Sequence, residues 1–423
     1  MLKGFKFSDM AKKKVIVLGG GIIGLATAYY LDIDGHDVSV IDKGKLESGV
    51  SHINSGYLTP SHIVPMAAPG IISKGIRWMF NSSSPFYIKP RFDLDLINWG
   101  LKFMKSCTPE HVHNSMKSIL DINLLSKKLY LEMKESKAFD FHLESKGLLM
   151  AYKTSQAEKE ESEIALWAKD LGLNVNQISQ KEILKMQPKA PMNIAGAFIY
   201  KSDAHTTPDL FMSNLKKHLL SKGVKFILQT EVSYFRKKGS QILELHTNNG
   251  VFKADDFVLA TGAWSELILK KLGIYLSVQA GKGYRINVNQ KTGIKIPAIL
   301  LESKVAVTPM EGFTRFGGTM ELSGINHRIN LKRVESIAKA ARNYYPGLAI
   351  PQSSIDQVKS GLRPLSPDGL PFIGRHSSLA NLVLATGHSM MGWSLGPATG
   401  KLVAEIISGY SSTINLKPYN PER

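Results

Sequence analysis

The stretch from Lys14 to Asp42, KVIVLGGGIIGLATAYYLDIDGHDVSVID, decides the fold of this chain. Val15 to Leu18 is a short apolar run, which predicts a strand buried on both faces. A glycine-rich turn with G-x-G-x-x-G spacing follows and opens a helix of small and apolar residues that ends at Gly35. His36 to Ile41 then predicts a second strand. This order of elements is typical of a βαβ unit that binds a dinucleotide.

The three glycines of the turn have separate expected roles. Gly19 allows the tight turn, Gly21 lets the backbone approach a pyrophosphate, and Gly24 lets the helix lie close to the strand. The first turn of the helix offers free N–H groups and a positive dipole end to the phosphates, so the expected site includes Ile22 and Ile23. The alternative interpretation is a glycine turn that serves structure alone.

An acid ends the second strand. A carboxylate at Asp42 can bind a ribose hydroxyl of the dinucleotide, and Lys43 beside it joins the expected site. The acid argues against a cofactor with a 2′-phosphate, such as NADP. The unit by itself leaves both NAD and FAD open.

Length and composition limit the class of protein. A chain of 423 residues exceeds one ordinary hydrophobic core, so two domains are expected. The 43% hydrophobic and 21% charged residues are typical of a soluble globular protein, and no window of 18 consecutive apolar residues predicts a spanning helix. Residues 1–13 are basic and lack the apolar stretch of a secretion signal. The single cysteine, Cys107, excludes an intrachain disulfide and a cysteine-ligated metal cluster, which fits a reducing cytoplasm. No metal is expected.

The net charge of +18 leaves two interpretations open. The lysines are scattered along the chain, and no nucleic-acid-binding motif accompanies them, so nucleic acid is not an expected partner. A solvated basic surface is the simpler explanation. Peripheral attachment to anionic lipid is the second, because each basic group near such a surface contributes about 1 kcal/mol. The expected location is therefore the cytoplasm, with possible attachment to the inner face of the membrane.

A loop of small and polar residues follows the second strand and carries the first resemblance to a known family. Its S-x-x-N-x-G pattern at Ser51, Asn54 and Gly56, with the proline-rich run 65–70 after it, resembles the FAD-dependent D-amino-acid oxidase superfamily, most closely its bacterial D-amino-acid dehydrogenase branch. The resemblance implies FAD as the cofactor. It also implies cofactor contacts from the remaining loop positions His52, Ser55 and Leu58.

Two further segments match the family. Gln241–His246 and Val251–Leu259 flank Asn249-Gly250, a strong hairpin signal, and the second arm runs into A-T-G at residues 260–262. In the resembled family a strand of this kind closes over the flavin side, which adds Thr261 and Gly262 to the expected site and favours FAD over NAD. The resemblance also implies an adenine contact by the backbone at Val232.

The C-terminal part carries the remaining motifs. Gly361-Leu362-Arg363-Pro364 precedes a P-D-G-x-P-x-I-G run, and a strand then leads to Thr386-Gly387-His388. A glycine-bounded helix start follows, and the resemblance implies that its backbone amides face the flavin pyrimidine carbonyl, where negative charge collects on reduction. The expected flavin contacts here are Gly387, Gly392, Trp393, Ser394 and Leu395. The resemblance covers Lys14 to Ile407.

Four side chains are candidates for a role in the reaction. Arg363 is the best candidate for clamping a substrate carboxylate, and the competing view is a structural ion pair with Asp368. Tyr284 is a second candidate carboxylate ligand, or else a core residue. His205 either projects into the substrate cavity or is a satisfied structural histidine, which is the safer interpretation. His388 completes the candidate set.

The predicted fold is α/β, with a discontinuous Rossmann-like FAD-binding domain and a substrate domain of mixed β-sheet plus helices. The FAD-binding domain is expected from residues 12–90, 195–275 and 350–423, and the substrate domain from 91–194 and 276–349. Residues 331–345 predict a basic amphipathic helix within the substrate domain.

The resemblance implies oxidative deamination of an amino acid, with hydride transfer from Cα to flavin N5 and electrons passed to a quinone or similar acceptor. The protein would supply mainly orientation and electrostatics. Other functions stay open: oxidation of a secondary amine such as sarcosine or a proline derivative, a subunit of an electron-transfer complex, or a non-catalytic FAD-binding protein. Relatives that oxidise glycine carry an arginine where this chain has Ser389-Met390-Met391, which lowers the odds of glycine as substrate.

Overall fold

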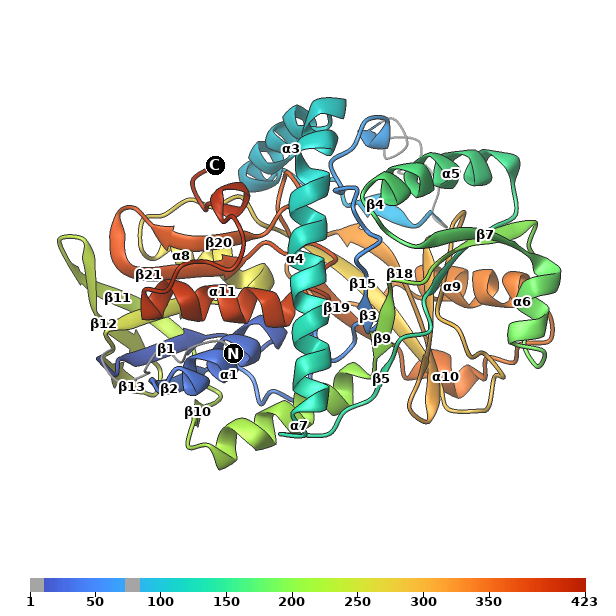
Figure 1. Cartoon of the computed structure of the whole chain (residues 1–423). Helices are drawn as coiled ribbons and strands as arrows, with labels where there is room; N and C mark the ends of the chain where they lie inside the picture. The colour runs from blue at the N-terminus through green and yellow to red at the C-terminus, as the bar shows by residue number, and fades with distance from the viewer. Residues whose placement is uncertain (1–10, 73–83) are drawn as a thin grey trace.

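The computed structural model describes residues 11–72 and 84–423. The glycine-rich unit lies in a six-stranded sheet with the order β10-β2-β1-β14-β21-β20. The first five strands are parallel and β20 is antiparallel to β21. Helices α1 and α11 pack against each other over this sheet (Figure 1). The elements are β1 (Lys14–Leu18), α1 (Ile22–Ile33), β2 (Asp37–Ile41), β10 (Lys225–Ile227), β14 (Asp256–Leu259), β20 (Phe372–His376), β21 (Leu379–Thr386) and α11 (Gly396–Ser408).

A second, nine-stranded mixed sheet occupies the other side of the molecule (Figure 1). Its order is β19-β15-β18-β17-β16-β6-β8-β7, and β4 pairs with β18. Helix α9 (Leu331–Tyr344) packs on one face through apolar residues such as Val334 and Ile337. The strands are β4 (Phe86–Ile88), β6 (Leu148–Tyr152), β7 (Val175–Ser179), β8 (Gly196–Tyr200), β15 (Gln279–Val288), β16 (Ala298–Leu300), β17 (Val305–Met310), β18 (Phe313–Leu322) and β19 (Lys359–Leu365).

Two small sheets and the remaining helices complete the described parts of the chain. One small sheet is the hairpin-like β11-β12-β13, and the other, β3-β9-β5, lies between the large sheets (Figure 1). These elements are β3 (Tyr57–Leu58), α3 (Leu94–Ser106), α4 (Pro109–Glu135), β5 (Leu143–Glu144), α5 (Ser155–Asp170), α6 (Gln180–Met186), β9 (Ala204–Thr206), α7 (Pro208–Ser221), β11 (Val232–Lys238), β12 (Gln241–Thr247), β13 (Gly250–Phe252), η1 (Gly262–Trp264), α8 (Ser265–Lys270), α10 (Gln352–Asp356) and η2 (Lys417–Tyr419).

The long helix α4 runs between the two large sheets in Figure 1 and packs against α11. Its buried polar side chains reach the segment before α11: the Tyr130 hydroxyl donates to the Trp393 carbonyl at 2.8 Å, and Asn123 accepts from the Ser394 hydroxyl at 2.6 Å. Pro109 and the capping hydroxyl of Thr108 begin this helix. Helix α4 therefore holds the C-terminal segment in place, although it belongs to a distant part of the sequence.

The α/β prediction is confirmed, as are the hairpin signal at residues 249–250 and the helix expected over 331–345. The expected single arm Val251–Leu259 is wrong. The chain leaves the hairpin after Phe252 and starts a separate strand at Asp256, which enters the six-stranded sheet beside β1. Three residues suffice to pass from one sheet to the other.

Sheet membership also differs from the expected division of the chain. Strands β4, β8 and β19 fall within the ranges expected for the FAD-binding domain, yet each pairs within the nine-stranded sheet. Which sheet a strand joins depends on pairing with strands far apart in sequence, so no local sequence pattern predicts it. The residue boundaries of the two domains stay a prediction.

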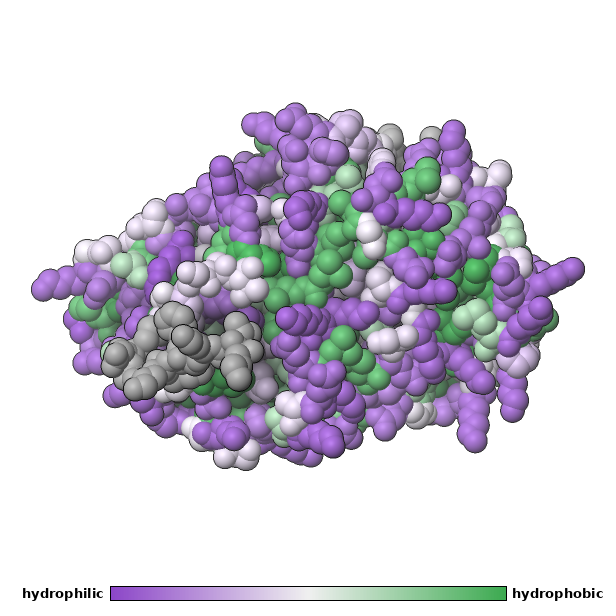
Figure 2. Space-filling view, in the orientation of Figure 1, coloured by the Kyte–Doolittle hydropathy of each residue, from purple (hydrophilic) through white to green (hydrophobic). Residues whose placement is uncertain are grey.

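Hydrophilic side chains cover most of the face seen in Figure 2, with smaller apolar patches between them. Within residues 11–72 and 84–423, no helix combines the length and the apolar character needed to cross a membrane.

Candidate active site

The glycine turn between β1 and α1 has the geometry that its sequence predicts. Gly19 has φ +100°, and a β-carbon there would lie 2.5 Å from the Ala260 carbonyl oxygen. A β-carbon on Gly24 would overlap the Gly19 carbonyl, so the helix could not approach the strand as it does. Both glycines are therefore required by close backbone contacts.

Backbone N–H groups at this turn remain available to a ligand. The Gly20 amide donates to Asp42 Oδ2 at 2.7 Å and the Ile22 amide donates to Ser51 Oγ at 3.0 Å. The Gly21 and Ile23 amides donate no hydrogen bond to any described residue. Unpaired amides at the start of a helix fit a pyrophosphate group.

Asp42 and Lys43 lie at the carboxyl end of β2, as expected. Asp42 accepts backbone amides on both oxygens, with Gly44 at 2.7 Å on Oδ1, and each oxygen keeps a lone pair for a ribose hydroxyl. The ammonium of Lys43 lies 3.8 Å from the ring centre of Trp264, two residues after Gly262. The predicted binding site for the adenosine end of the dinucleotide is therefore bordered by a cation stacked on an aromatic ring.

The loop 51–58 is held mainly by the nine-stranded sheet. The buried guanidinium of Arg315 on β18 donates to the carbonyls of His52 at 2.9 Å and Asn54 at 2.6 Å. The Thr308 hydroxyl donates to the Ser55 carbonyl at 2.8 Å. The Asn54 side chain in turn accepts the Gly56 amide at 2.8 Å.

The end of this loop closes against β9. Gly56 has φ +75° and accepts the Thr206 amide at 2.8 Å, while Leu58 is fully buried. The His52 ring points toward Asp209, with 3.7 Å between Nδ1 and Oδ1. The sequence pattern therefore identifies the loop, but the arginine that fixes it comes from a distant strand.

Strand ends from four distant segments meet at one edge of the six-stranded sheet, where parallel sheets bind ligands. Ser265, just after the A-T-G element, bonds the Thr386 hydroxyl at 2.6 Å, and Thr386 donates to the Gly262 carbonyl. Gly387 follows with φ +74°. The expected contacts Thr261, Gly262 and Gly387 are thus brought to the same edge as the glycine turn.

Val232 begins β11 and is buried, with its carbonyl accepting the Lys271 ammonium at 3.0 Å. Its role toward adenine stays a prediction.

The segment before α11 presents free amides. Among the described residues, the N–H groups of Gly392, Trp393 and Ser394 have no acceptor, whereas those of Met391 and Leu395 on either side are paired. The side chains point elsewhere: Trp393 Nε1 donates to the Thr206 hydroxyl at 2.8 Å, and Ser394 bonds Asn123. These positions can therefore serve a cofactor only through the backbone, as expected for amides that face a flavin carbonyl.

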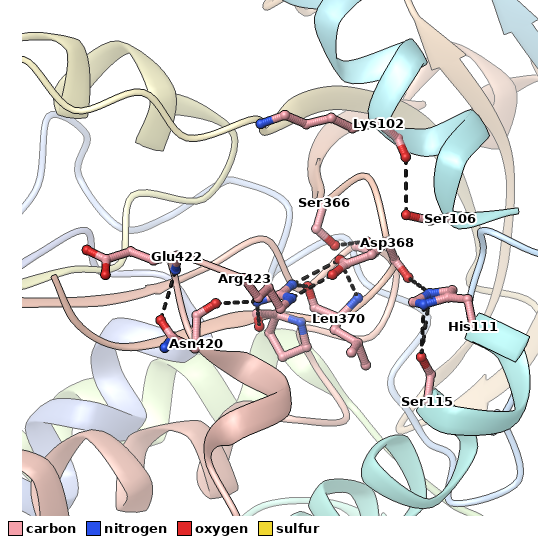
Figure 3. Close-up of polar contacts among 12 residues, drawn as sticks. Lys102, Ser106, His111, Ser115, Ser366, Asp368, Leu370, Asn420, Glu422 and Arg423 are labelled. Carbon is pink, nitrogen blue, oxygen red and sulfur yellow. Dashed lines mark hydrogen bonds and ion pairs between the residues drawn. The ribbon is translucent and has the colours of Figure 1, made fainter. Parts of the chain in front are cut away.

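Arg363 is a partly buried cation without a carboxylate partner in the described residues. Its Nη1 donates to the Thr319 carbonyl at 2.9 Å, and burial lowers its pKa to about 10, so it stays charged at neutral pH. The expected alternative, an ion pair with Asp368, is wrong. Asp368 instead accepts two bonds from Arg423, at 2.6 and 2.9 Å, and its carbonyl bonds His111 (Figure 3).

Strand pairing shows which face Arg363 occupies. It lies opposite Gly281, so Gly281, Gly283, Arg285, Gly361 and Arg363 project from one face of β15 and β19. A β-carbon on Gly361 would meet Ile53 and Val50, and one on Gly317 of β18 would lie 2.8 Å from Ser55 Oγ. This face therefore packs against the loop that is expected to hold the flavin.

Tyr284 lies on the opposite face and does not join Arg363. Its hydroxyl donates to Glu321 Oε2 at 2.8 Å, and Lys282 pairs with Glu321 at 3.0 Å. Tyr284 packs in the core under α9. The core interpretation of Tyr284 is the one that this geometry supports, because a strand alternates its side chains between two faces.

Arg285, the next residue, was not singled out by the sequence and does face the loop. Its Nε is buried and has no partner within the described chain. The register of β15 with β19, rather than either strand's own sequence, places Arg285 and not Tyr284 on the face of Arg363.

The two candidate histidines are both buried. His388 Nε2 bonds the Thr399 hydroxyl at 3.0 Å, and burial lowers its pKa to about 3, so it is neutral at physiological pH. Its backbone lies beside β19 through a bridge to Leu365, although its ring points to α11. Burial lowers the pKa of His205 to about 4. The Glu144 carboxylate lies 3.4 Å from Nε2 and the Pro309 carbonyl lies near the ring, although neither ring nitrogen of His205 meets full hydrogen-bond geometry, so its role stays a prediction.

The sequence model of the DAO family, described as FAD dependent oxidoreductase, matches residues 14–406. The chain belongs to this family. It is 33% identical over 410 residues to a protein of Neisseria meningitidis named D-amino acid dehydrogenase, which covers 95% of this chain and 97% of the relative. A Granulibacter bethesdensis protein of the same name is 28% identical over 95% of this chain and 97% of the relative.

Solved structures share the fold of this FAD dependent oxidoreductase. The glycine oxidase of Geobacillus kaustophilus has a TM-score of 0.76 at 24% identity, covering 97% of this chain and 99% of the other. The L-proline dehydrogenase of P. horikoshii has a TM-score of 0.74 at 20% identity, covering 98% of each chain. The predictions of an FAD-dependent oxidoreductase and of FAD as cofactor are confirmed, and the unpaired amides and glycine contacts described above fit that cofactor.

Proposed function

We propose that this protein oxidises a D-amino acid at its Cα–N bond and passes the electrons to a quinone or similar acceptor. The name of the 33% identical relative supports the substrate class. The observation that carries the proposal is Arg363, a partly buried cation without a carboxylate partner among the described residues, on the face that packs against loop 51–58. An amino-acid carboxylate is the anion that such a guanidinium binds best, through two parallel hydrogen bonds.

The residues of the chain divide the remaining tasks. Bound FAD would supply the hydride-accepting chemistry of the reaction. The free amides of Gly392, Trp393 and Ser394 can stabilise the negative charge that reduction creates. Arg363 orients the substrate, and Arg285 adds a second positive charge on the same face. No general base is needed if the substrate amine binds neutral, and His388 is held by Thr399 rather than turned to the site.

Glycine and secondary amines are less well supported as substrates than a D-amino acid. This chain has Ser389-Met390-Met391 where glycine-oxidising relatives carry an arginine, so glycine would lose a carboxylate contact. The Ser389 amide donates instead to the Pro364 carbonyl at 2.8 Å, which fixes this segment beside β19. Oxidation of a secondary amine remains the second function, because the L-proline dehydrogenase of P. horikoshii has the same fold.

The exposed surface of helix α3 suggests that the protein docks on an anionic membrane, where a quinone acceptor would be found. Four large apolar side chains share one exposed stripe, with Leu94 62%, Ile97 46%, Leu101 50% and Met104 48% exposed. Lys102 and Lys105 are exposed on the same helix. An apolar stripe flanked by lysines is the pattern of a helix that lies in the lipid interface, and the net charge of +18 adds attraction to anionic lipid.

Anaerobic reduction of the flavin tests the proposed reaction. We expect the visible flavin absorbance to bleach with a D-amino acid and not with its L-enantiomer, sarcosine or glycine. Arg363→Lys should keep the flavin and lower kcat/KM by about 30-fold to several-thousand-fold, since loss of a bidentate contact costs roughly 2–5 kcal/mol. Arg423→Lys, at the Asp368 pair, is the matched control. Bleaching by L-proline or sarcosine alone would favour the second function, and normal kcat/KM in Arg363→Lys would contradict the clamp.

A further inference from the structure

His142, Glu144 and His205 form a cluster outside the residues assigned to flavin or substrate. The small sheet pairs Glu144 of β5 with His205 of β9, and His142 directly precedes β5. One ligand atom from each residue can be chosen so that all lie within 4.8 Å of one another. His205 Nε2 lies 3.4 Å from Glu144 Oε2, and His142 Nε2 lies 3.9 Å from Glu144 Oε1.

His205 gives the second, independent sign of a ligand. Its side chain is fully buried, and neither ring nitrogen meets hydrogen-bond geometry with a described residue. Its contacts with Glu144 and Pro309 fall short of hydrogen-bond geometry, and a buried polar group that is imperfectly paired is costly and calls for a physical explanation. The Nε2 atom is the one aimed at Glu144, and the nearby Pro309 carbonyl can serve the ring as a backbone acceptor.

The second histidine is already oriented. His142 Nδ1 bonds the Thr207 hydroxyl at 2.9 Å, and that hydroxyl also accepts the Glu311 amide at 2.9 Å. This leaves His142 Nε2 directed at Glu144. In the tautomer that donates Nδ1–H to this hydroxyl, Nε2 keeps a lone pair for a metal ion, which is the usual arrangement of a metal-binding histidine.

The cluster is reachable from solvent on one side. The Glu144 side chain is 35% exposed and the His142 side chain 17%. On that side the Lys146 ammonium lies 2.8 Å from Glu144 Oε2 and competes for the carboxylate. Glu144 Oε1 carries no such bond, so the carboxylate can bridge the lysine and a cation.

We propose that His142, Glu144 and His205 bind one divalent transition-metal ion, with Zn²⁺ as the best match to two imidazoles and a carboxylate. In a tetrahedral site with bonds near 2.1 Å the donor atoms are about 3.4 Å apart. The separations of 3.4 and 3.9 Å involve different oxygens of Glu144. With one ligand atom from each residue the donors lie within 4.8 Å of one another, so the side chains would draw together on binding, and water would supply the fourth ligand. Softer thiolate-preferring ions and hard Mg²⁺ suit this donor set less well.

The metal would brace the segment that carries the flavin loop. Thr206, next to His205, donates its amide to Gly56 and accepts the Trp393 indole N–H. The ion would link the segment after α4, which carries His142 and Glu144, to His205 on β9. This link would keep the contacts of Thr206 in place. Its role is structural rather than catalytic.

Calorimetric titration of Zn²⁺ into the FAD-loaded, chelator-dialysed protein tests the site, together with the thermal midpoint of unfolding. We expect one equivalent to bind and the midpoint to rise with free Zn²⁺, since a ligand of the folded state stabilises it by mass action. Glu144→Gln and His142→Gln should each lower the affinity at least tenfold while keeping the flavin. His113→Gln, exposed on α4, is the matched control.

A further variant separates a metal site from an ion-pair network. Lys146→Met removes the competing cation, so it should tighten Zn²⁺ binding if the cluster is a metal site. The proposal is wrong if wild type binds less than one equivalent, if Glu144→Gln binds Zn²⁺ as wild type does, or if Lys146→Met leaves the affinity unchanged or weaker.

Discussion

The guanidinium of Arg363 lies directly over Gly283 of the neighbouring strand, in space that a β-carbon on Gly283 would fill. We therefore predict that Gly283→Ala moves the clamp without unfolding the protein, because the atoms displaced are the far end of a flexible side chain. The kcat/KM for the amino acid should fall about tenfold or more, since a small misplacement of a binding group is costly. Steady-state kinetics with a soluble dye acceptor would measure it. Gly100→Ala, on α3 with no atom within 4 Å, is the control, and equal kinetics in both variants would contradict the prediction.

Asp42→Ala should weaken FAD binding. The carboxylate holds the amides of Gly20 and Gly44 and is the expected partner of the ribose. Loss of one charge-assisted hydrogen bond costs roughly 1.5–3 kcal/mol, which is about 10- to 150-fold in Kd. Flavin fluorescence titration of the apoprotein would give the constants. Asp37→Ala changes an exposed ion pair on the same strand and should leave Kd unchanged. Full FAD occupancy of Asp42→Ala after gel filtration would argue against the ribose contact.

His388 should contribute to the pH dependence of stability. Burial lowers its pKa from 6.5 to about 3, so the folded protein binds fewer protons at this site than the unfolded chain between these values. Its contribution to stability is therefore lost as the pH falls below 6.5. Relative to wild type, His388→Gln should gain about 2 kcal/mol on going from pH 7 to pH 5, at 1.36 kcal/mol per pH unit. Urea unfolding at both pH values measures this, and an equal difference at pH 7 and pH 5 would show that His388 does not titrate as inferred.

The apolar stripe of α3 should control binding to anionic vesicles. Ile97→Asp and Leu101→Asp place charge on the exposed face, so the double variant should no longer sediment with vesicles at low ionic strength. Wild-type sedimentation should fall as salt is added, because screening weakens the basic contribution. Tyr275→Asp, at a site 82% exposed elsewhere, is the matched control. If wild type stays in the supernatant at low salt, α3 is not a membrane-docking helix.

Features that depend on short-range contacts could be predicted from the sequence. The close approach of Gly24 to the Gly19 carbonyl depends on residues five positions apart, and it occurs as the glycine spacing predicts. The match of this chain to the family model covers the same motifs. These patterns can be recognised because the residues that contact one another are close in the sequence.

Features that depend on long-range pairing could not be predicted. The choice between Tyr284 and Arg285 depends on the register of β15 with β19, about which neither strand alone carries information. Asp368 finds its partner in Arg423 at the end of the chain rather than in nearby Arg363. The cluster of Glu144 and His205 likewise exists only because two short strands pair.

Arg315 has a kinetic consequence for the cofactor. It extends from the nine-stranded sheet, holds the carbonyls of His52 and Asn54, and pairs with Asp209 at 2.7 Å. Opening the loop for FAD to leave therefore means breaking both hydrogen bonds between the buried guanidinium of Arg315 and the loop carbonyls of His52 and Asn54. Flavin exchange should then require separation of loop 51–58 from the nine-stranded sheet. A substrate bound at Arg363 on that sheet would oppose this separation and would prolong the residence time of the flavin.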